Sequence, residues 1–258
     1  MLRLTLALSG IVGLGSANAF GGIEILAGSG WAGSQGGSYT PYQDGDGGEF
    51  TVLNNSGSVA SSFTPAGYSS EALYTLGTND NPTGSLAGLT GFETFCVEGG
   101  TNEVYFTPGA VYNYTLSENV VGGRTLVLTA GAAWLYSEFA TGGLSSYGYD
   151  YTPANRTADA GLLQNAIWYL LGETGSGNAL SAAAATQLGG LGIAQESVVT
   201  YGNDFGVSVM NLTDGNGNSA QNQLYYSPVP DSGTTILLMG LSLMATAFLA
   251  RHRRAHQA

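Results

Sequence analysis

The most nucleophilic side chain in this sequence is the thiol of Cys96, in the stretch FETFCVEGG. The chain has no second cysteine, so this thiol has no intrachain disulfide partner. A lone cysteine is commonly a small buried hydrophobic residue. In a secreted chain it can also form an intermolecular disulfide or act as a reactive thiol. The residue type alone leaves these alternatives open.

The remaining side chains exclude several kinds of catalytic site. Residues 20–227, which we call the body, contain no histidine and no lysine, because His252 and His256 lie near the C-terminus. The body therefore cannot form a Ser-His-Asp triad, a Cys-His pair, a Schiff base or a histidine zinc site. A glycosidase needs only two carboxylates, but no pair stands out by its spacing. We expect a protein that is not an enzyme.

Two loops carry side-chain oxygens at alternate positions, as ligands of one calcium ion can. The candidate ligands are Asp44, Asp46 and Glu49 in the first loop, and Asp214, Asn216 and Asn218 in the second. The second loop has Ser219 where an EF-hand loop requires glycine. Both loops contain Asp-Gly or Asn-Gly pairs, which favour hairpin turns. We predict turns and no cofactor, with calcium binding as the alternative.

Two segments resemble the thioester domain of bacterial surface adhesins, also called the TQXA-type domain. These are FCV at residues 95–97 and, further along the chain, LQNAIW at residues 163–168. The resemblance covers residues 92–173, and this chain has Leu163 where some members carry threonine. It implies that the sulfur of Cys96 attacks the side-chain carbonyl of Gln164, that ammonia leaves, and that a thioester joins a strand to a helix.

A stored thioester needs protection from water and from internal nucleophiles. Phe92, Phe95 and Trp168 are bulky neighbours in sequence that could shield it. A strand and a helix can hold the thiol and the amide in near-attack geometry, whereas a loop cannot. The absence of lysine from the body also agrees with a stored electrophile.

The N-terminus reads as a secretory signal peptide over residues 1–19. Arg3 supplies the positive charge, residues 4–14 form the apolar region, and Ala17-Asn18-Ala19 is a small-x-small cleavage pattern. We predict cleavage after Ala19.

The C-terminal segment, residues 228–258, predicts membrane insertion and sorting. Residues 234–250 are apolar and long enough to span a bilayer, and the basic tail 251–258 places the C-terminus in the cytoplasm. The motif before them resembles the VPDSG variant of the PEP-CTERM sorting signals: Val229, Pro230, Asp231, Ser232 and Gly233. The resemblance implies processing by an exosortase-type membrane protease and delivery to the cell surface. An ordinary single-span anchor is the alternative.

The body is strongly acidic. Of the eighteen acidic residues in the chain, all but Asp231 lie in it, against only Arg124 and Arg156 as basic residues, so its net charge is near −15. Such a surface repels nucleic acid and anionic lipid. We expect neither as a partner of the body.

The body reads as one mainly β domain with a small helical insertion around residues 129–188. Short strands are predicted between Gly, Asn, Ser and Pro turns, at residues 22–26, 49–53, 58–63, 91–97, 111–115 and 125–128. Helical spacing predicts helices near residues 130–141, 157–171 and 178–188, with Thr157 as the cap of the second. Residues 205–212 and 220–227 form a predicted hairpin. We expect an antiparallel β-sandwich or a barrel-like fold.

These patterns predict an exported surface or extracellular-matrix protein that couples covalently, through a Cys96–Gln164 thioester, to a protein or polysaccharide nucleophile. The main alternative is a passive structural or glycan-associated envelope β-sandwich in which Cys96 is merely packed. A third is a calcium-dependent carbohydrate-binding module that uses the acidic loops and the tyrosines.

Overall fold

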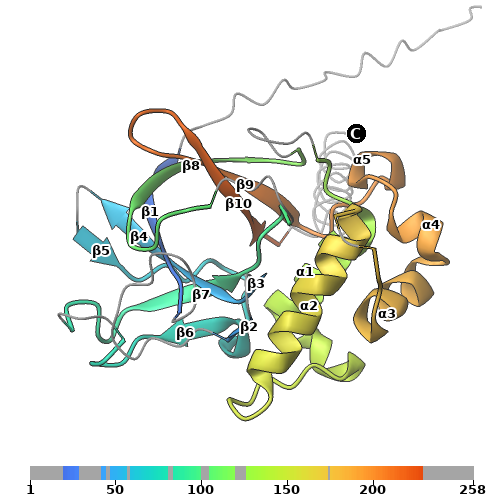
Figure 1. The fold of residues 1–258 in the computed structure, drawn as a ribbon, viewed down its shortest axis with the longest axis horizontal. Helices are drawn as coiled ribbons and strands as arrows, with labels where there is room; N and C mark the ends of the chain where they lie inside the picture. The colour runs from blue at the N-terminus through green and yellow to red at the C-terminus, as the bar shows by residue number, and fades with distance from the viewer. Residues whose placement is uncertain are drawn as a thin grey trace, which may run out of the picture.

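The computed structural model describes residues 20–28, 42–44, 47–56, 59–80, 84–99, 105–119, 126–173 and 175–228 (Figure 1). The predicted signal peptide, sorting motif 229–233, spanning segment 234–250 and tail 251–258 lie outside these residues and stay predictions. None of the helices within the described ranges has the length and apolar character needed to cross a bilayer.

Antiparallel strands form most of the body, as the turn chemistry predicts. The main sheet has the order β10-β9-β8-β1-β4-β7-β6, and β5 pairs with β4. Its strands are β1 (Phe20–Leu26), β4 (Phe50–Ser56), β5 (Val59–Ser61), β6 (Leu73–Thr75), β7 (Thr90–Thr94), β8 (Val111–Ser117), β9 (Val207–Thr213) and β10 (Ser219–Tyr226). A separate ribbon pairs β2 (Gln43–Asp44) with β3 (Gly47–Gly48). The mainly antiparallel β class is therefore confirmed.

The hydrogen-bonded path of the main sheet closes on itself. Just after β7, the N–H of Val97 donates to the carbonyl of Asn222, and the N–H of Leu224 donates to the carbonyl of Phe95. Both Asn222 and Leu224 belong to β10, which lies at the other end of the strand order. The segment 95–97 thereby joins β7 to β10.

The helical segment is longer than expected and continues to Tyr201. It contains α1 (Ala130–Thr141), the 3-10 helix η2 (Gly143–Tyr147), α2 (Arg156–Leu171), α3 (Ala179–Leu188), α4 (Leu191–Ala194) and α5 (Val198–Tyr201). A further 3-10 helix, η1 (Ser70–Ala72), precedes β6. Figure 1 shows the five α-helices gathered on one side of the strands.

Local signals explain where the helices begin and end. Thr129 caps α1 by accepting from the N–H of Ala132, and Asn178 forms a capping box at α3. Gly172 ends α2 in the left-handed conformation with φ of 81°. The predicted cap of α2 is wrong, because the helix begins at Arg156 and Thr157 lies inside it.

The strand predicted at residues 125–128 is not seen where the structure describes it. Residues 126–128 form no strand, and Val127 makes an isolated bridge to Asn119. On α2, the apolar side chain of Leu162 is 47% exposed, whereas the polar side chain of Gln164 is buried. The face of α2 that packs inward therefore includes a polar side chain.

Two large hydrophobic clusters form most of the core. The first lies between the helices and the outer side of the strands and contains Phe95 and Val97. The second is formed by side chains of β1, β4, β7, β8 and β9, and it contains Phe92 and Cys96. Cys96 and Phe95 thus belong to different clusters, since neighbouring residues of an extended segment face opposite sides.

Candidate functional site

Cys96 lies directly opposite Gln223 of β10 in an isolated antiparallel bridge. The ladder hydrogen bonds are made by the flanking residues, so this is a non-hydrogen-bonded pair. In such a pair the two side chains share one face of the sheet and approach closely. The side-chain nitrogen Nε2 of Gln223 is 3.8 Å from the sulfur Sγ of Cys96.

Gln164 reaches Cys96 from α2. It contacts the N–H and the carbonyl of Cys96, which do not bond to β10. The N–H of Cys96 donates to Oε1 of Gln164 at 3.0 Å, and Nε2 of Gln164 donates to the carbonyl of Cys96 at 2.8 Å. The side-chain amide of Gln164 thus makes the pair of hydrogen bonds that the backbone of a neighbouring strand would make with Cys96. Cys96 and Gln164 lie side by side, as the sequence predicts, but the contact described is between the amide of Gln164 and the backbone of Cys96.

Two glycines allow α2 to approach this site. A Cβ atom on Gly47 of β3 would lie 2.4 Å from Cγ of Gln164, and one on Gly99 would lie 2.8 Å from the ring of Trp168. The same added Cβ on Gly47 would lie 3.0 Å from the ring of Trp168. The indole N–H of Trp168 is buried and has no hydrogen-bond acceptor among the described residues.

The site is closed to water. Cys96 and Gln223 are fully buried, and Gln164 is 1% exposed. Phe92 belongs to the cluster that contains Cys96, and Trp168 packs against that cluster, so both occupy the shielding positions expected for them. Phe95 does not, because its ring packs against α1 on the opposite side.

Polar contacts fix the register of β10 against the segment that contains Cys96. The carboxylate of Glu98 accepts from the backbone N–H of Asn222 at 2.8 Å and from its side-chain Nδ2 at 2.6 Å. Gln221 donates to the carbonyl of Glu98 at 3.3 Å. These bonds hold Gln223 opposite Cys96 on a paired strand instead of a mobile loop.

Sequence reasoning missed Gln223. Its oxygen Oε1 is buried and has no hydrogen-bond partner in the part of the chain that the structure describes. The available signal was the run Gln221-Asn222-Gln223, three consecutive amides in the middle of a predicted strand. Buried amides of this kind are costly unless paired, so such a run indicates a specific role.

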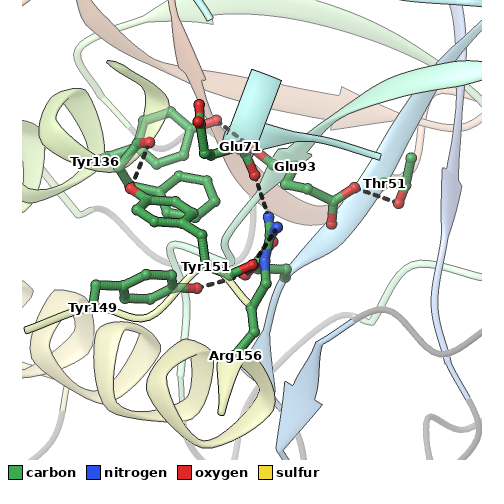
Figure 2. Close-up of polar contacts among 9 residues, drawn as sticks. Thr51, Glu71, Glu93, Tyr136, Tyr149, Tyr151 and Arg156 are labelled. Atoms are coloured by element: carbon green, nitrogen blue, oxygen red, sulfur yellow. Dashed lines mark hydrogen bonds and ion pairs between the residues drawn. The ribbon is translucent and has the colours of Figure 1, made fainter. Parts of the chain in front are cut away.

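A second buried polar cluster lies near the place where α2 packs on the β2–β3 ribbon (Figure 2). The guanidinium of Arg156 donates to both carboxylate oxygens of Glu49, at 2.8 and 2.6 Å, and to the carbonyl of Glu71 at 2.6 Å. Tyr149 donates to the same carboxylate at 2.5 Å. The ring of Tyr42 lies 4.4 Å from the guanidinium carbon. This bidentate pair anchors the helical segment to the sheet.

Glu93 of β7 lies beside this pair and has an altered acidity. Burial and, to a smaller extent, the neighbouring charge of Glu49 raise the pKa of Glu93 to about 8. Its oxygen Oε1 accepts from the hydroxyl of Thr51 at 2.5 Å, while Oε2 has no partner among the described residues. Burial also raises the pKa of Glu49, and Arg156 opposes that effect.

The second acidic loop forms a turn, whereas residues 45–46 of the first loop lie outside the described residues. The carboxylate of Asp214 accepts from the backbone N–H groups of Asn216 and Asn218 and from the side chain of Asn218. These bonds hold the pKa of Asp214 below its usual value. In the first loop, Glu49 is committed to Arg156, and the side chains of Asp44 and Asp46 lie outside the described part. No group of three or more His, Cys, Asp or Glu suited to a metal occurs among the described residues.

Other known proteins offer no analogy for this site. Comparisons with protein-family models, with curated proteins and with solved structures found no match. The interpretation therefore rests on the geometry around Cys96 and on the sequence patterns.

Proposed function

We propose that the body is an exported bacterial surface or extracellular-matrix domain that stores an internal thioester at Cys96 and uses it once to attach covalently to another molecule. The observation that carries this proposal is the contact of 3.8 Å between the buried sulfur of Cys96 and the side-chain amide of Gln223.

The proposed reaction balances without an added reagent. The sulfur attacks the amide carbon Cδ, the Sγ–Cδ bond forms, and the Cδ–Nε2 bond breaks. The thiol proton leaves with the amide group as ammonia. A primary amine on the target later attacks the same carbon, forms a stable amide and returns the thiol. Pairing of the reactants on a rigid strand supplies the near-attack geometry that the first step requires.

Two glutamines are available as the acyl donor, and the contacts favour Gln223. To react, Gln164 would have to give up two hydrogen bonds to the Cys96 backbone. Gln223 already meets the sulfur, and its Oε1 has no competing donor among the described residues. Gln164 then holds the Cys96 backbone in place, although it stays the donor that the sequence resemblance implies.

The terminal segments complete the proposal. A signal peptide ending at Ala19 exports the chain, the segment 234–250 holds it in the inner membrane, and an exosortase-type protease acts on the motif 229–233. The target is a nucleophile on a surface protein or polysaccharide. Because the acyl group is transferred once and is not regenerated, the protein is not a turnover catalyst.

Mass spectrometry tests this proposal and distinguishes the two glutamines. We expect peptide mapping of the purified exported protein, kept free of amines, to find Cys96 linked to Gln223 with loss of one ammonia. Methylamine should convert Gln223 to its methylamide and expose the thiol. Cys96→Ala and Gln223→Ala should both abolish the link.

The matched variant is Gln164→Ala. It should lower the yield of the link without changing its position, because it removes a group that holds the backbone. A link found at Gln164 would reverse the assignment of the two glutamines. Unmodified Cys96, Gln164 and Gln223 in fresh protein would contradict the thioester and favour the passive envelope protein.

A further inference from the structure

A hydroxyl and a carboxyl group meet in the interior at a second place, away from Cys96. Thr51 of β4 and Glu93 of β7 are directly opposite each other in the antiparallel register. The hydroxyl oxygen Oγ1 of Thr51 lies 2.5 Å from Oε1 of Glu93, and both residues are fully buried. Figure 2 shows the two side chains pointing toward one another across the strands.

The carboxyl group of Glu93 is in the protonated form, which can acylate a hydroxyl group. Its pKa of about 8, raised by burial and by Glu49, leaves it protonated at neutral pH. A protonated carboxyl has a usable leaving group, whereas a carboxylate does not. The oxygen Oε2 of Glu93 has no hydrogen-bond partner among the described residues, so no such bond has to break when this oxygen leaves.

The surroundings also favour the step. The guanidinium of Arg156 acts electrostatically on Glu93 and lowers its pKa, so it stabilises negative charge at that carboxyl group. A tetrahedral intermediate would place negative charge there. Paired side chains on rigid strands reach effective concentrations on the order of 10⁵ M, well above the roughly 55 M of liquid water that reverses the reaction.

We propose that Thr51 and Glu93 join in an ester that links β4 to β7. Oγ1 of Thr51 attacks Cδ of Glu93 and the Oγ1–Cδ bond forms. The bond from Cδ to the protonated oxygen breaks, and the hydroxyl leaves with the threonine proton as water. No oxidant or co-reactant is needed. Exclusion of water from the site then protects the ester from hydrolysis.

This cross-link differs from the proposed thioester in position and in chemistry, and neither depends on the other. It would join β4 to β7, and residues 95–97, which carry Cys96, directly follow β7. A pulling force on a surface attachment would then meet a covalent bond between strands instead of hydrogen bonds alone. The ester would therefore give mechanical strength to a domain that attaches covalently to its target.

Peptide mapping of the denatured, exported protein tests the ester. We expect the peptides that contain Thr51 and Glu93 to appear as one linked species lacking one water, and mild alkali to separate them with the gain of that water. Cys96→Ala should keep the ester although it abolishes the thioester, so the two proposals can be tested separately. Thr51→Ser keeps the hydroxyl and should keep the link, while Thr51→Val should lose it. Full-mass, separate peptides from the folded wild-type protein would overturn the proposal.

The pH dependence of stability provides a second readout. In Thr51→Val, Glu93 stays a free acid whose folded pKa lies above its usual value near 4.5. Between about pH 4.5 and 8 the folded state then binds a proton that the unfolded state releases, so the free energy of unfolding falls as the pH rises. In the esterified wild type Glu93 cannot titrate, so the free energy of unfolding should fall less over this pH range. An equal fall in both proteins, measured by urea unfolding, would count against the ester.

Discussion

At the scale of single residues, identical side chains have different roles because they meet different atoms of Cys96. The amide of Gln164 bonds the backbone of Cys96 through both of its ends, and the amide of Gln223 faces the sulfur. The first arrangement satisfies buried polar groups and the second leaves an oxygen unpartnered within the described structure. We therefore assign the acyl group of the proposed thioester to Gln223.

The ion pair of Arg156 and Glu49 gives the strongest residue-scale prediction for stability. Arg156→Met should lower the free energy of unfolding by about 3–5 kcal/mol, because it leaves a buried carboxylate without its cation. The double variant Arg156→Met with Glu49→Gln should lose less than the two single variants together, since no unpaired charge remains. Urea unfolding at pH 7 measures all of these variants. Additive losses would show that the two groups act separately.

At the scale of elements, α2 is positioned by small residues on the surfaces that it contacts. The segments around Gly47 and Gly99 allow Gln164 and Trp168 to reach their places. Neither glycine needs a left-handed backbone, because neither has a positive φ, so it is the space that matters. A short ribbon, β2–β3, therefore decides where one turn of a helix meets Cys96.

Gly47→Ala should push α2 away from this site. We expect a loss of about 1–3 kcal/mol in the free energy of unfolding, because the new Cβ would overlap the side chain of Gln164. The yield of the Cys96 link should also fall. Gly192→Ala is the matched control: nothing lies within 4 Å of its Cβ position in α4, so it should be neutral or slightly stabilising. Chemical unfolding with peptide mapping measures both effects, and equal behaviour of the two variants would refute the role of Gly47.

At the scale of the whole molecule, negative charge dominates. The chain carries a net charge of −12, and Arg156, a basic residue of the body, is buried in its ion pair. Self-repulsion of this kind favours expanded states.

Sodium chloride should stabilise the protein. Raising the salt from about 0.02 to 0.5 M shortens the screening length several-fold and weakens repulsion between surface carboxylates. We expect a gain of about 1 kcal/mol in the free energy of unfolding. The gain should persist in Arg156→Met, because the buried pair is screened much less than the surface is. Urea unfolding at the two salt concentrations measures it, and a loss of stability on adding salt would mean that attractive surface pairs dominate.

The sequence by itself determined the class of the protein and much of its local structure. Turn pairs and alternating strands predicted the antiparallel sheet and the hairpin of β9 and β10, and Gly172 marked the end of α2. Local signals of this kind depend on a few neighbouring residues. The sequence also singled out Cys96, and the family resemblance named Gln164, whose amide hydrogen-bonds the backbone of Cys96.

Only the tertiary structure decided which groups meet. Gln223 lies opposite Cys96 because β10 returns to the segment after β7, which is a pairing between residues more than a hundred positions apart. The same closure sends Phe95 to the opposite cluster from Cys96. Glu49, read from the sequence as a loop ligand, pairs with Arg156 because α2 packs on the β2–β3 ribbon, directly before Glu49. Spacing along the chain cannot specify such contacts, since they follow from how strands and helices close around a common core.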